Sequence, residues 1–322
     1  MKQSRSLSSF TRRHGAQVSF VVAAIGLLAS GHRASATAQG PDACTVTSKL
    51  MRTSCKHEKK DDFWRTRAIC QNLPTPLERE ACMQQAAREL HDALEECDDV
   101  FEARQDVCQL LGGGIYAPAI DPANFVAHVA NPYMPLVPGT TTIFESQGNG
   151  SLEHIEVTVT HNTRVILGVT CTEVHDVGAV DGEINEDTLD WFAQDLAGNV
   201  WYFGENSKSI EADLVVSLEG SWEAGVDGAK PGIIMRAQPE IGLLYRQEFA
   251  LGDAEDVARL IGVGLDVTVP FGAFHNCWQT EEFAALEPDV FEQKFYAPGI
   301  GVIRELDPES GEVVDLIDVQ HN

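Results

Sequence analysis

Six cysteines in the first third of the chain share one centre of symmetry. Taken as nested pairs, they are all centred on residue 76: Cys70 with Cys82, Cys55 with Cys97, and Cys44 with Cys108. A chain that folds back at residue 76 brings the members of each pair opposite one another. An even number of cysteines in an exported chain is typical of a disulfide framework. The spacing therefore predicts these three bonds.

The segments on either side of residue 76 are typical of two long helices. Spacings of 11 and 15 residues separate successive cysteines, and both lie close to whole turns at about 3.6 residues per turn. Thr75, Pro76 and Glu78 form an N-cap, a first-turn proline and a capping box, and Gly112 is a typical helix end. We expect an αα-hairpin with the nested bonds. Other pairings and a metal site are the alternatives, but no Cys-x-x-Cys pair favours zinc.

The first 38 residues have the pattern of a secretory signal peptide. Basic residues lie between positions 2 and 13, an apolar run covers 16–28, and small residues suited to cleavage lie at 34–38. The apolar run is short of the roughly 20 residues that cross a bilayer. We expect cleavage, export to the periplasm or the extracellular space, and no stable membrane insertion afterwards. A retained anchor is one alternative, and Arg12-Arg13 raises the twin-arginine route as another.

Charge divides the chain unevenly. The net charge is −26 for 322 residues, and it becomes −31 without the first 38 residues, which hold five basic residues and no acid. Residues 44–112 have a net charge of −3, whereas 113–322 contain eight Lys and Arg against thirty-five Asp and Glu. This excludes an electrostatic nucleic-acid binder, which needs a basic face. A small molecule, a cation or a basic protein is the expected partner.

The composition changes at Gly112–Gly114. We therefore divide the chain into a signal peptide (1–38), a six-cysteine helical hairpin (39–112), a linker and entry segment (113–139) and an acidic β domain (140–322).

Residues from Thr140 onward alternate and turn often, as antiparallel strands do. Expected strands are Thr140–Ser146, His154–Thr160, Arg164–Gly168, Cys171–Val177, Thr188–Gln194, Val200–Gly204, Leu214–Leu218, Leu243–Phe249, Leu265–Val269, Cys277–Phe283, Glu292–Tyr296, Gly301–Leu306 and Val313–Val319. Two turns are expected at 161–163 and 198–199, and one short helix at Asp253–Ile261. The fold class is α+β, with a large antiparallel all-β domain that forms a sandwich or an open barrel.

Two further cysteines, Cys171 and Cys277, lie in expected strands of the β domain. We expect a disulfide between them, with buried free thiols as the alternative.

Several dense motifs occur in the β domain. They are NPYMPLVPGT at 131–140, EDTLDWFAQD at 186–195, GNVWYFGE at 198–205, GSWEAGVDGAKPG at 220–232 and YAPGIG at 296–301. Over roughly residues 115–306 the chain resembles a group of exported bacterial proteins and lipoproteins without an assigned activity. The resemblance implies export and an all-β domain, and it carries no catalytic residues.

Motifs of nucleophilic hydrolases, phosphate-binding loops and zinc peptidases do not occur. Calcium is the candidate cofactor, because Asp181, Glu183, Asn185 and Asp187 place oxygen donors in one short segment after a strand. Solvated turns are the alternative. A second candidate metal site combines His175, His275 and a carboxylate.

Four acids lie beside aromatic residues, an arrangement found in sugar-cleaving sites. They are Asp190, Glu205, Glu223 and Glu248, and the aromatic residues are Trp191, Trp201, Trp222 and Tyr245. Core aromatics with acids facing water explain the same pattern.

Two interpretations of function follow. The first is an exported non-catalytic protein, stabilised by calcium, that binds a ligand or partner; it predicts an apolar cavity with acids scattered over the surface. The second is an exported hydrolase with a carboxylate or metal centre in the β domain; it predicts that two or three acids or histidines converge in a cleft with raised pKa values. The sequence favours the first, because no catalytic motif supports an enzyme.

Overall fold

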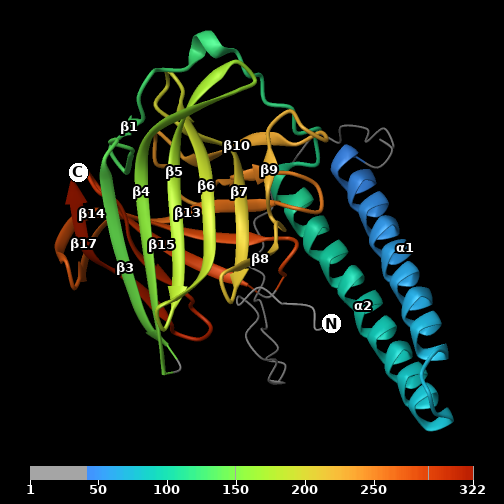
Figure 1. Ribbon diagram of the computed structural model, residues 1–322. Coiled ribbons are helices and arrows are strands. Elements are labelled where there is room, and N and C mark those ends of the chain that lie inside the picture. Colours follow the sequence, from blue (N-terminus) through green and yellow to red (C-terminus); the bar gives the residue numbers. More distant parts are fainter. Residues whose placement is uncertain (1–41, 149, 289, 322) are drawn as a thin grey trace, which may run out of the picture.

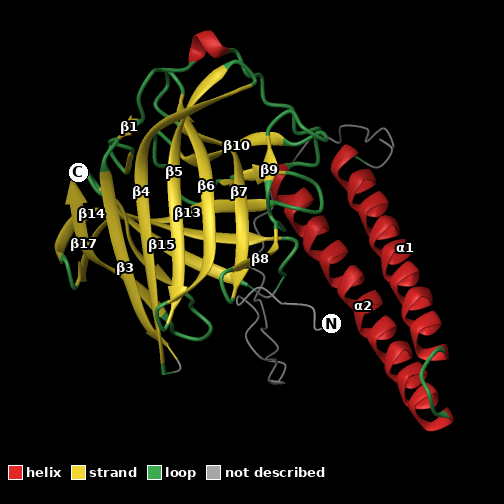
Figure 2. Cartoon of the chain, viewed as in Figure 1, coloured by secondary structure: helices red, strands yellow, loops and turns green. Residues whose placement is uncertain are grey.

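The computed structural model describes residues 42–148, 150–288 and 290–321, in which a pair of helices lies beside a β domain (Figure 1). The predicted signal peptide, 1–38, lies outside the described residues. The described helices are mainly this pair. A short 3-10 turn, η1 (Pro122–Asn124), lies at the top of the β domain in the view of Figure 2. In the part of the chain described, no helix combines the length and apolar character needed to cross a membrane.

The helical hairpin has the predicted geometry. Helix α1 (Ala43–Gln71) and helix α2 (Pro76–Leu111) are joined by the bonds Cys44–Cys108, Cys55–Cys97 and Cys70–Cys82. Thr75 and Glu78 form the capping box, and Gly112 ends α2 in the left-handed region. The nested pairing is therefore confirmed, and each bond stabilises the hairpin by roughly 2–4 kcal/mol, mainly by restricting the unfolded chain.

The rest of the described chain is built from strands. Their bounds are β1 (Ala130–Asn131), β2 (Met134–Pro135), β3 (Thr140–Gly148), β4 (Ser151–Ile166), β5 (Val169–Val180), β6 (Glu183–Gln194), β7 (Val200–Glu211), β8 (Leu214–Ser217), β9 (Trp222–Glu223), β10 (Lys230–Met235), β11 (Leu244–Arg246), β12 (Glu248–Phe249), β13 (Asp256–Val269), β14 (Gly272–Ala284), β15 (Phe291–Ala297), β16 (Gly301–Leu306) and β17 (Val313–His321). All pairings between them are antiparallel.

One sheet wraps almost completely around the domain. Its order is β11-β13-β14-β15-β16-β17-β3-β4-β5-β6-β7-β10-β12, with β8 and β9 attached to β7. The two ends of this path, β11 and β12, are separated in the chain by Gln247 alone, so the sheet returns to its own starting edge. At this seam the backbone of Gln247 approaches Gly232, where an added Cβ would lie 2.3 Å from the Gln247 carbonyl oxygen. The expected sandwich or open barrel is therefore a nearly closed barrel.

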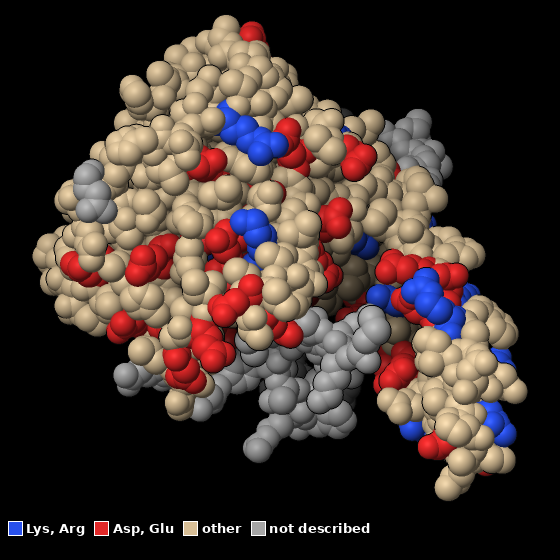
Figure 3. Space-filling model, in the orientation of Figure 1, with Lys and Arg blue, Asp and Glu red and all other residues tan. Residues whose placement is uncertain are grey.

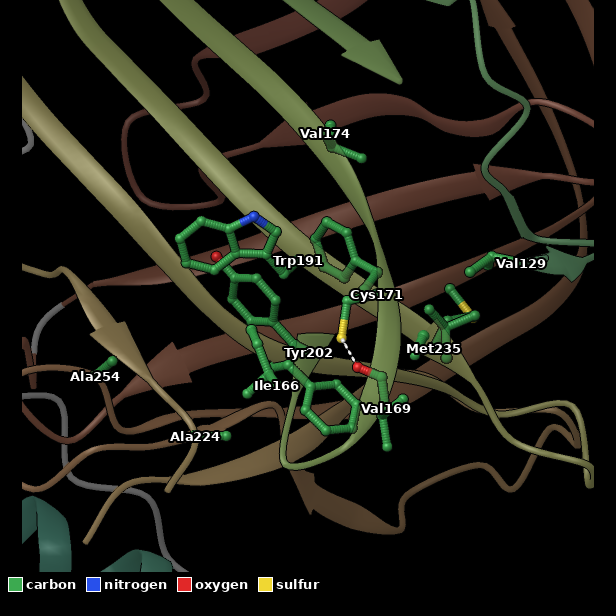
Figure 4. Packing of buried hydrophobic residues seen from close by; sticks show 14 of the residues in the cluster. Val129, Ile166, Val169, Cys171, Val174, Trp191, Tyr202, Ala224, Met235 and Ala254 are labelled. Atoms are coloured by element: carbon green, nitrogen blue, oxygen red, sulfur yellow. Dashed lines mark hydrogen bonds between the residues drawn. The ribbon is translucent and has the colours of Figure 1, made fainter. Parts of the chain in front are cut away.

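An apolar core fills one end of the barrel. Buried residues of β4 to β7, among them Ile166, Trp191 and Tyr202, pack around Cys171 (Figure 4). The entry segment covers this end: Phe125 packs against the core, and Tyr133 stacks on Trp278 with ring centroids 3.8 Å apart. Segment 113–139 is therefore a cap on the barrel as well as a linker.

The hairpin is attached to the β domain through the end of α2. Arg104 donates two hydrogen bonds to Glu255, and both side chains are more than nine-tenths buried. Val107 packs beside this pair with Leu244, Val257 and Ala285. The opposite end of the hairpin projects away from the barrel (Figure 1).

Three expectations for the β domain are wrong. Cys171 and Cys277 form no bond: both are free and buried, and they belong to separate hydrophobic clusters. The helix expected at Asp253–Ile261 is instead a turn followed by β13, because pairing with β11 and β14 outweighs a local helical pattern. The turn expected at 161–163 is an irregularity inside the continuous strand β4, and the chain reverses at Leu167-Gly168.

The cysteines give a direct test of the fold. Because Cys171 and Cys277 are buried, the mature native protein should show almost no reaction with an aromatic disulfide reagent, and two thiols per chain should react after unfolding without reductant. Six more should appear only after reduction, since the hairpin holds three disulfides. An unfolded, non-reduced chain without free thiols would contradict the structure.

Candidate functional site

The inner face of the barrel changes from apolar to acidic along its strands. On β6 and β7, Phe192 pairs with Tyr202 at the end nearer the cap. Asp190, which is two residues farther from the cap on β6, pairs with Glu205. The cap is located by Val126, whose amide donates to the carbonyl of Gln194 on β6. Paired residues of neighbouring strands share a face of the sheet, so both carboxyl groups point to the side on which Tyr202 packs in the core.

The opposite wall of the barrel repeats this order. Trp278, which stacks on the cap, and Tyr296 are paired on β14 and β15, and Thr280 pairs with Lys294 beyond them. Lys294 in turn pairs with Glu305 on β16. The acidic groups of both walls therefore lie at the same level inside the barrel.

We call these groups the interior acidic cluster. Its members are Asp176, Asp190, Glu205, Glu248, Asp256, Glu282 and Glu305, together with the cation Lys294. Burial is the main cause of the raised pKa values of Asp176 and Glu205, and charges across the barrel add to it, among them Glu305 for Asp176 and Asp256 for Glu205. The cluster is thus one electrostatic unit contributed by strands from both walls.

Hydrogen bonds position part of the cluster. The Tyr202 hydroxyl donates to Asp190 at 2.5 Å. Both the Thr280 and the Tyr296 hydroxyls donate to Oε1 of Glu282, at 2.7 and 3.0 Å. Lys294 Nζ lies 3.5 Å from Glu282 and 3.8 Å from Glu305, and these carboxylates, with Glu305 first, raise the Lys294 pKa. Asp190, Glu282 and Lys294 are therefore held in defined positions.

Burial raises the pKa values of the acids in the cluster. It raises the pKa of Asp190 to about 7, although the Tyr202 hydrogen bond acts in the opposite direction. It raises the pKa of Glu205 to about 8, with repulsion from Asp190 as the next cause, and the pKa of Asp256 to about 6. The pKa of Glu248 also lies well above its usual range, chiefly because of burial. Several of these groups therefore change charge near neutral pH.

The carboxyl groups of Glu205 and Glu248 lie beside Trp222. The indole N–H of Trp222 is directed at both carboxyl groups and acts to lower their pKa values, but it makes no hydrogen bond in the described chain. Trp222 is 6% exposed and pairs with Glu205 across β9 and β7. At this position the backbone of β9 lies so close to Gly204 that an added Cβ would be 2.4 Å from the Trp222 carbonyl oxygen. Polar atoms this deeply buried normally have a partner.

Water can reach the interior acidic cluster. The side chains of Lys294 and Glu305 keep 25% and 34% of their surfaces accessible, even though burial is the main cause of the raised Glu305 pKa. An accessible side-chain surface and a pKa raised by burial are both expected for groups that line an interior space rather than a dry core. Acids also gather over the lower part of the β domain, away from the cap, on the face seen in Figure 3.

The candidate calcium ligands are not brought together. Asp181 lies in the β5–β6 turn and accepts a hydrogen bond from the amide of Leu152. Asp187 forms an ion pair with Lys208, with Nζ and Oδ1 2.6 Å apart. Glu183 is exposed at the start of β6, and Asn185 Oδ1 is buried without a partner in the described chain. No group of three or more His, Cys, Asp or Glu side chains with metal-binding spacing occurs among the described residues.

The second candidate metal site is also not assembled. His175 lies 3.6 Å from Asp187, and the exposed His275 lies 2.7 Å from Asp266. Each histidine has a carboxylate neighbour, but the two do not belong to one metal-binding group within the described chain.

Three of the four acids singled out in the sequence do converge. Asp190, Glu205 and Glu248 belong to the interior acidic cluster, whereas Glu223 lies on the other face and pairs with Arg164. Of the aromatic residues, Trp222 borders the cluster, while Trp201 donates to Asp195. The interior is therefore not the apolar cavity expected of the first interpretation.

Sequence reasoning missed Asp176, Glu282, Glu305 and Lys294. One usable signal was present: Trp278, Thr280 and Glu282 occupy alternate positions of β14 and so share a face. A run that passes from aromatic to acidic on one face indicates a buried acid. The pairing that joins these strands to β6 and β7 is not visible in the sequence.

Neither a protein-family model nor a curated protein matches the chain. Among solved structures, a putative lipoprotein from Parabacteroides distasonis aligns with 59% of this chain and 99% of its own, at 11% identity and a TM-score of 0.31. A TM-score of this size does not establish a shared fold.

The raised pKa values predict how stability depends on pH. Between about pH 4, where free carboxyls ionise, and about pH 8, the highest cluster pKa stated above, the folded chain holds protons that the unfolded chain has lost. The free energy of unfolding should therefore be largest at the acid end of this window and fall as pH rises through 6 to 8.

Urea unfolding at pH 5.5 and pH 8.5 measures this slope. The double variant Asp190→Asn, Glu205→Gln should flatten it, whereas Asp266→Asn, which alters a side chain that is 77% exposed, should leave it unchanged. A native slope equal to that of the double variant would contradict the raised pKa values.

Proposed function

We propose that the protein is exported and binds a small organic cation in the interior acidic cluster. Export is supported by the predicted signal peptide and by the three disulfides of the hairpin, since disulfides persist in oxidising compartments. The resemblance to exported bacterial proteins and lipoproteins points the same way.

One observation carries the binding proposal. Glu205 and Glu248 face the indole N–H of Trp222 inside the barrel, and this buried N–H has no hydrogen-bond partner among the described residues. A cation that reaches this place pairs with the two carboxyl groups. Removing a carboxylate from water without a partner is costly, so such a ligand recovers free energy that the empty site lacks.

The chemistry of the site favours an organic cation over calcium. Calcium requires six to eight oxygen atoms at about 2.3–2.6 Å, and the described chain has no group of acids with metal-binding spacing. Tyr202 and Trp222, whose ring centroids lie 5.5 Å apart, offer aromatic surface, which attracts ammonium groups. The free indole N–H also calls for an oxygen acceptor on the ligand. The expected ligand is therefore a small ammonium compound that carries a hydroxyl or carbonyl group.

Choline and its neutral isostere 3,3-dimethyl-1-butanol provide a matched test by calorimetry on the mature chain. Choline should bind, and the isostere should bind at least tenfold more weakly because it lacks the charge. Choline affinity should also rise from pH 5.5 to pH 8.5, because Asp190 and Glu205 ionise in that range, with pKa values of about 7 and about 8.

Variants locate the binding. Glu205→Gln, Glu248→Gln and Trp222→Phe should each weaken choline binding. Glu223→Gln should not, because Glu223 lies on the same strand as Trp222 but on its opposite face. Ethanolamine serves as a second, smaller probe. The proposal fails if neither amine binds at about 10 mM. The binding free energy would then be weaker than about −3 kcal/mol.

A second function, hydrolysis by a carboxyl pair, is favoured by the pairing of Asp190 with Glu205 across neighbouring strands. Their pKa values of about 7 and about 8 suit a general acid and base near neutral pH. Turnover of aryl glycosides with a bell-shaped pH profile, abolished by Asp190→Asn and by Glu205→Gln but not by Glu223→Gln, would establish it. Absence of turnover across a glycoside panel would contradict glycoside hydrolysis.

A further inference from the structure

A cavity lies where the hairpin meets the β domain. It measures about 100 Å³ and is lined by Cys44 and Ser48 of α1, Val107 and Cys108 of α2, Tyr116 of the entry segment and Phe249 of β12. The Cys44–Cys108 bond joins α1 to α2 beside the cavity, and the buried Arg104–Glu255 pair joins α2 to the β domain. The cavity is therefore a fixed feature of the junction and lies apart from the interior acidic cluster.

Two cations line this cavity without a carboxylate partner in the described residues. Arg246 lies 4.7 Å from the ring centroid of Phe249 and 5.6 Å from that of Tyr116, and its Nη2 approaches Cys44 Sγ at 4.0 Å. Lys230 donates to the carbonyl oxygen of Tyr116 and lies 5.2 Å from the Phe249 ring centroid. The remaining guanidinium N–H groups of Arg246 have no protein acceptor within the described ranges.

The acid that lines the cavity is already engaged. Glu255 accepts both hydrogen bonds from Arg104 and a third from the amide of Gly252. It therefore balances Arg104, while Arg246 and Lys230 keep the lining positive. This is unusual in a β half that carries thirty-five acids against eight basic residues. Burial lowers the pKa of Arg246, although the charge of Glu255 acts in the opposite direction, and this reflects the cost of keeping a cation away from water.

We infer that the junction cavity binds a small apolar carboxylate. Arg246 presents a planar fork of N–H groups, and a carboxylate is the anion that matches such a fork with two hydrogen bonds. The apolar part of the ligand lies against Val107, Ile115 and Leu251, which complete the lining. The volume of about 100 Å³ restricts the ligand to at most one small ring, since a cavity of roughly 150 Å³ holds benzene. This site is independent of the proposed cation site.

Benzoate, benzyl alcohol and sulfate separate the contributions to binding in calorimetry on the mature chain. Benzoate should bind. Benzyl alcohol should bind at least tenfold more weakly than benzoate because it has no charge, and sulfate should also bind at least tenfold more weakly because it has no apolar part. Sulfate binding equal to benzoate would overturn the proposal, since the cavity would then be a plain anion site. Absence of benzoate binding at about 10 mM, which means a binding free energy weaker than about −3 kcal/mol, would overturn it as well.

Variants assign the binding to Arg246. Arg246→Met keeps an unbranched apolar chain between the rings and should weaken benzoate binding at least tenfold. Arg67→Met is the matched control, because Arg67 lies over Phe63 and Trp64 at 5.4 and 4.9 Å but does not line the cavity; its affinity should equal that of the native chain. If Arg246→Met does not fold, Lys230→Gln provides the second measurement and should weaken binding at least threefold. Native affinity in either folded cavity variant would overturn the assignment.

Discussion

Carboxyl groups on the inner face of a closed sheet must be neutralised, and this requirement shapes the β domain. A carboxylate that leaves water without a partner is unstable, so it takes up a proton, pairs with a cation or receives hydrogen bonds. The barrel uses all three solutions. Burial holds the pKa of Asp190 at about 7, Lys294 lies among Glu282 and Glu305, and tyrosine hydroxyls donate to Asp190 and Glu282. Glu205 and Glu248 lie beside the Trp222 indole N–H, and burial is the main cause of their raised pKa values.

The neighbouring parts of the molecule support this arrangement. The entry segment closes one end of the barrel with Tyr133 stacked on Trp278, so the apolar core lies under the cap and the acids lie beyond it. The seam at Gln247 and Gly232 returns the sheet to its own edge and places Glu248 near the groups of β7. The hairpin lies outside the barrel, and its junction has the opposite charge balance. The chain therefore has two chemically distinct environments, the acidic barrel interior and the basic lining of the junction cavity.

The hairpin could be predicted from the sequence because its information is local. Cysteine spacing, a capping box and a terminal glycine all lie in or beside the two helices. Many strands could be placed as well, since alternation is also local. The failures are non-local: whether Cys171 meets Cys277 depends on how far apart β5 and β14 lie, and β13 is a strand because β11 and β14 pair with it. Asp190, Glu205 and Glu248 were found beside aromatic residues, but only strand pairing shows that Lys294 and Glu305 join them while Glu223 does not.

The central claim is that the interior carboxyl groups hold protons near neutral pH. Carbon-detected NMR titration of the side-chain carboxyl signals of Asp190 and Glu205 tests it most directly, with Asp266 as an exposed reference in the same sample. The account predicts midpoints of about 7 for Asp190 and about 8 for Glu205. Midpoints of about pH 4 for both residues, which is roughly the pKa of free carboxyl groups, would contradict it.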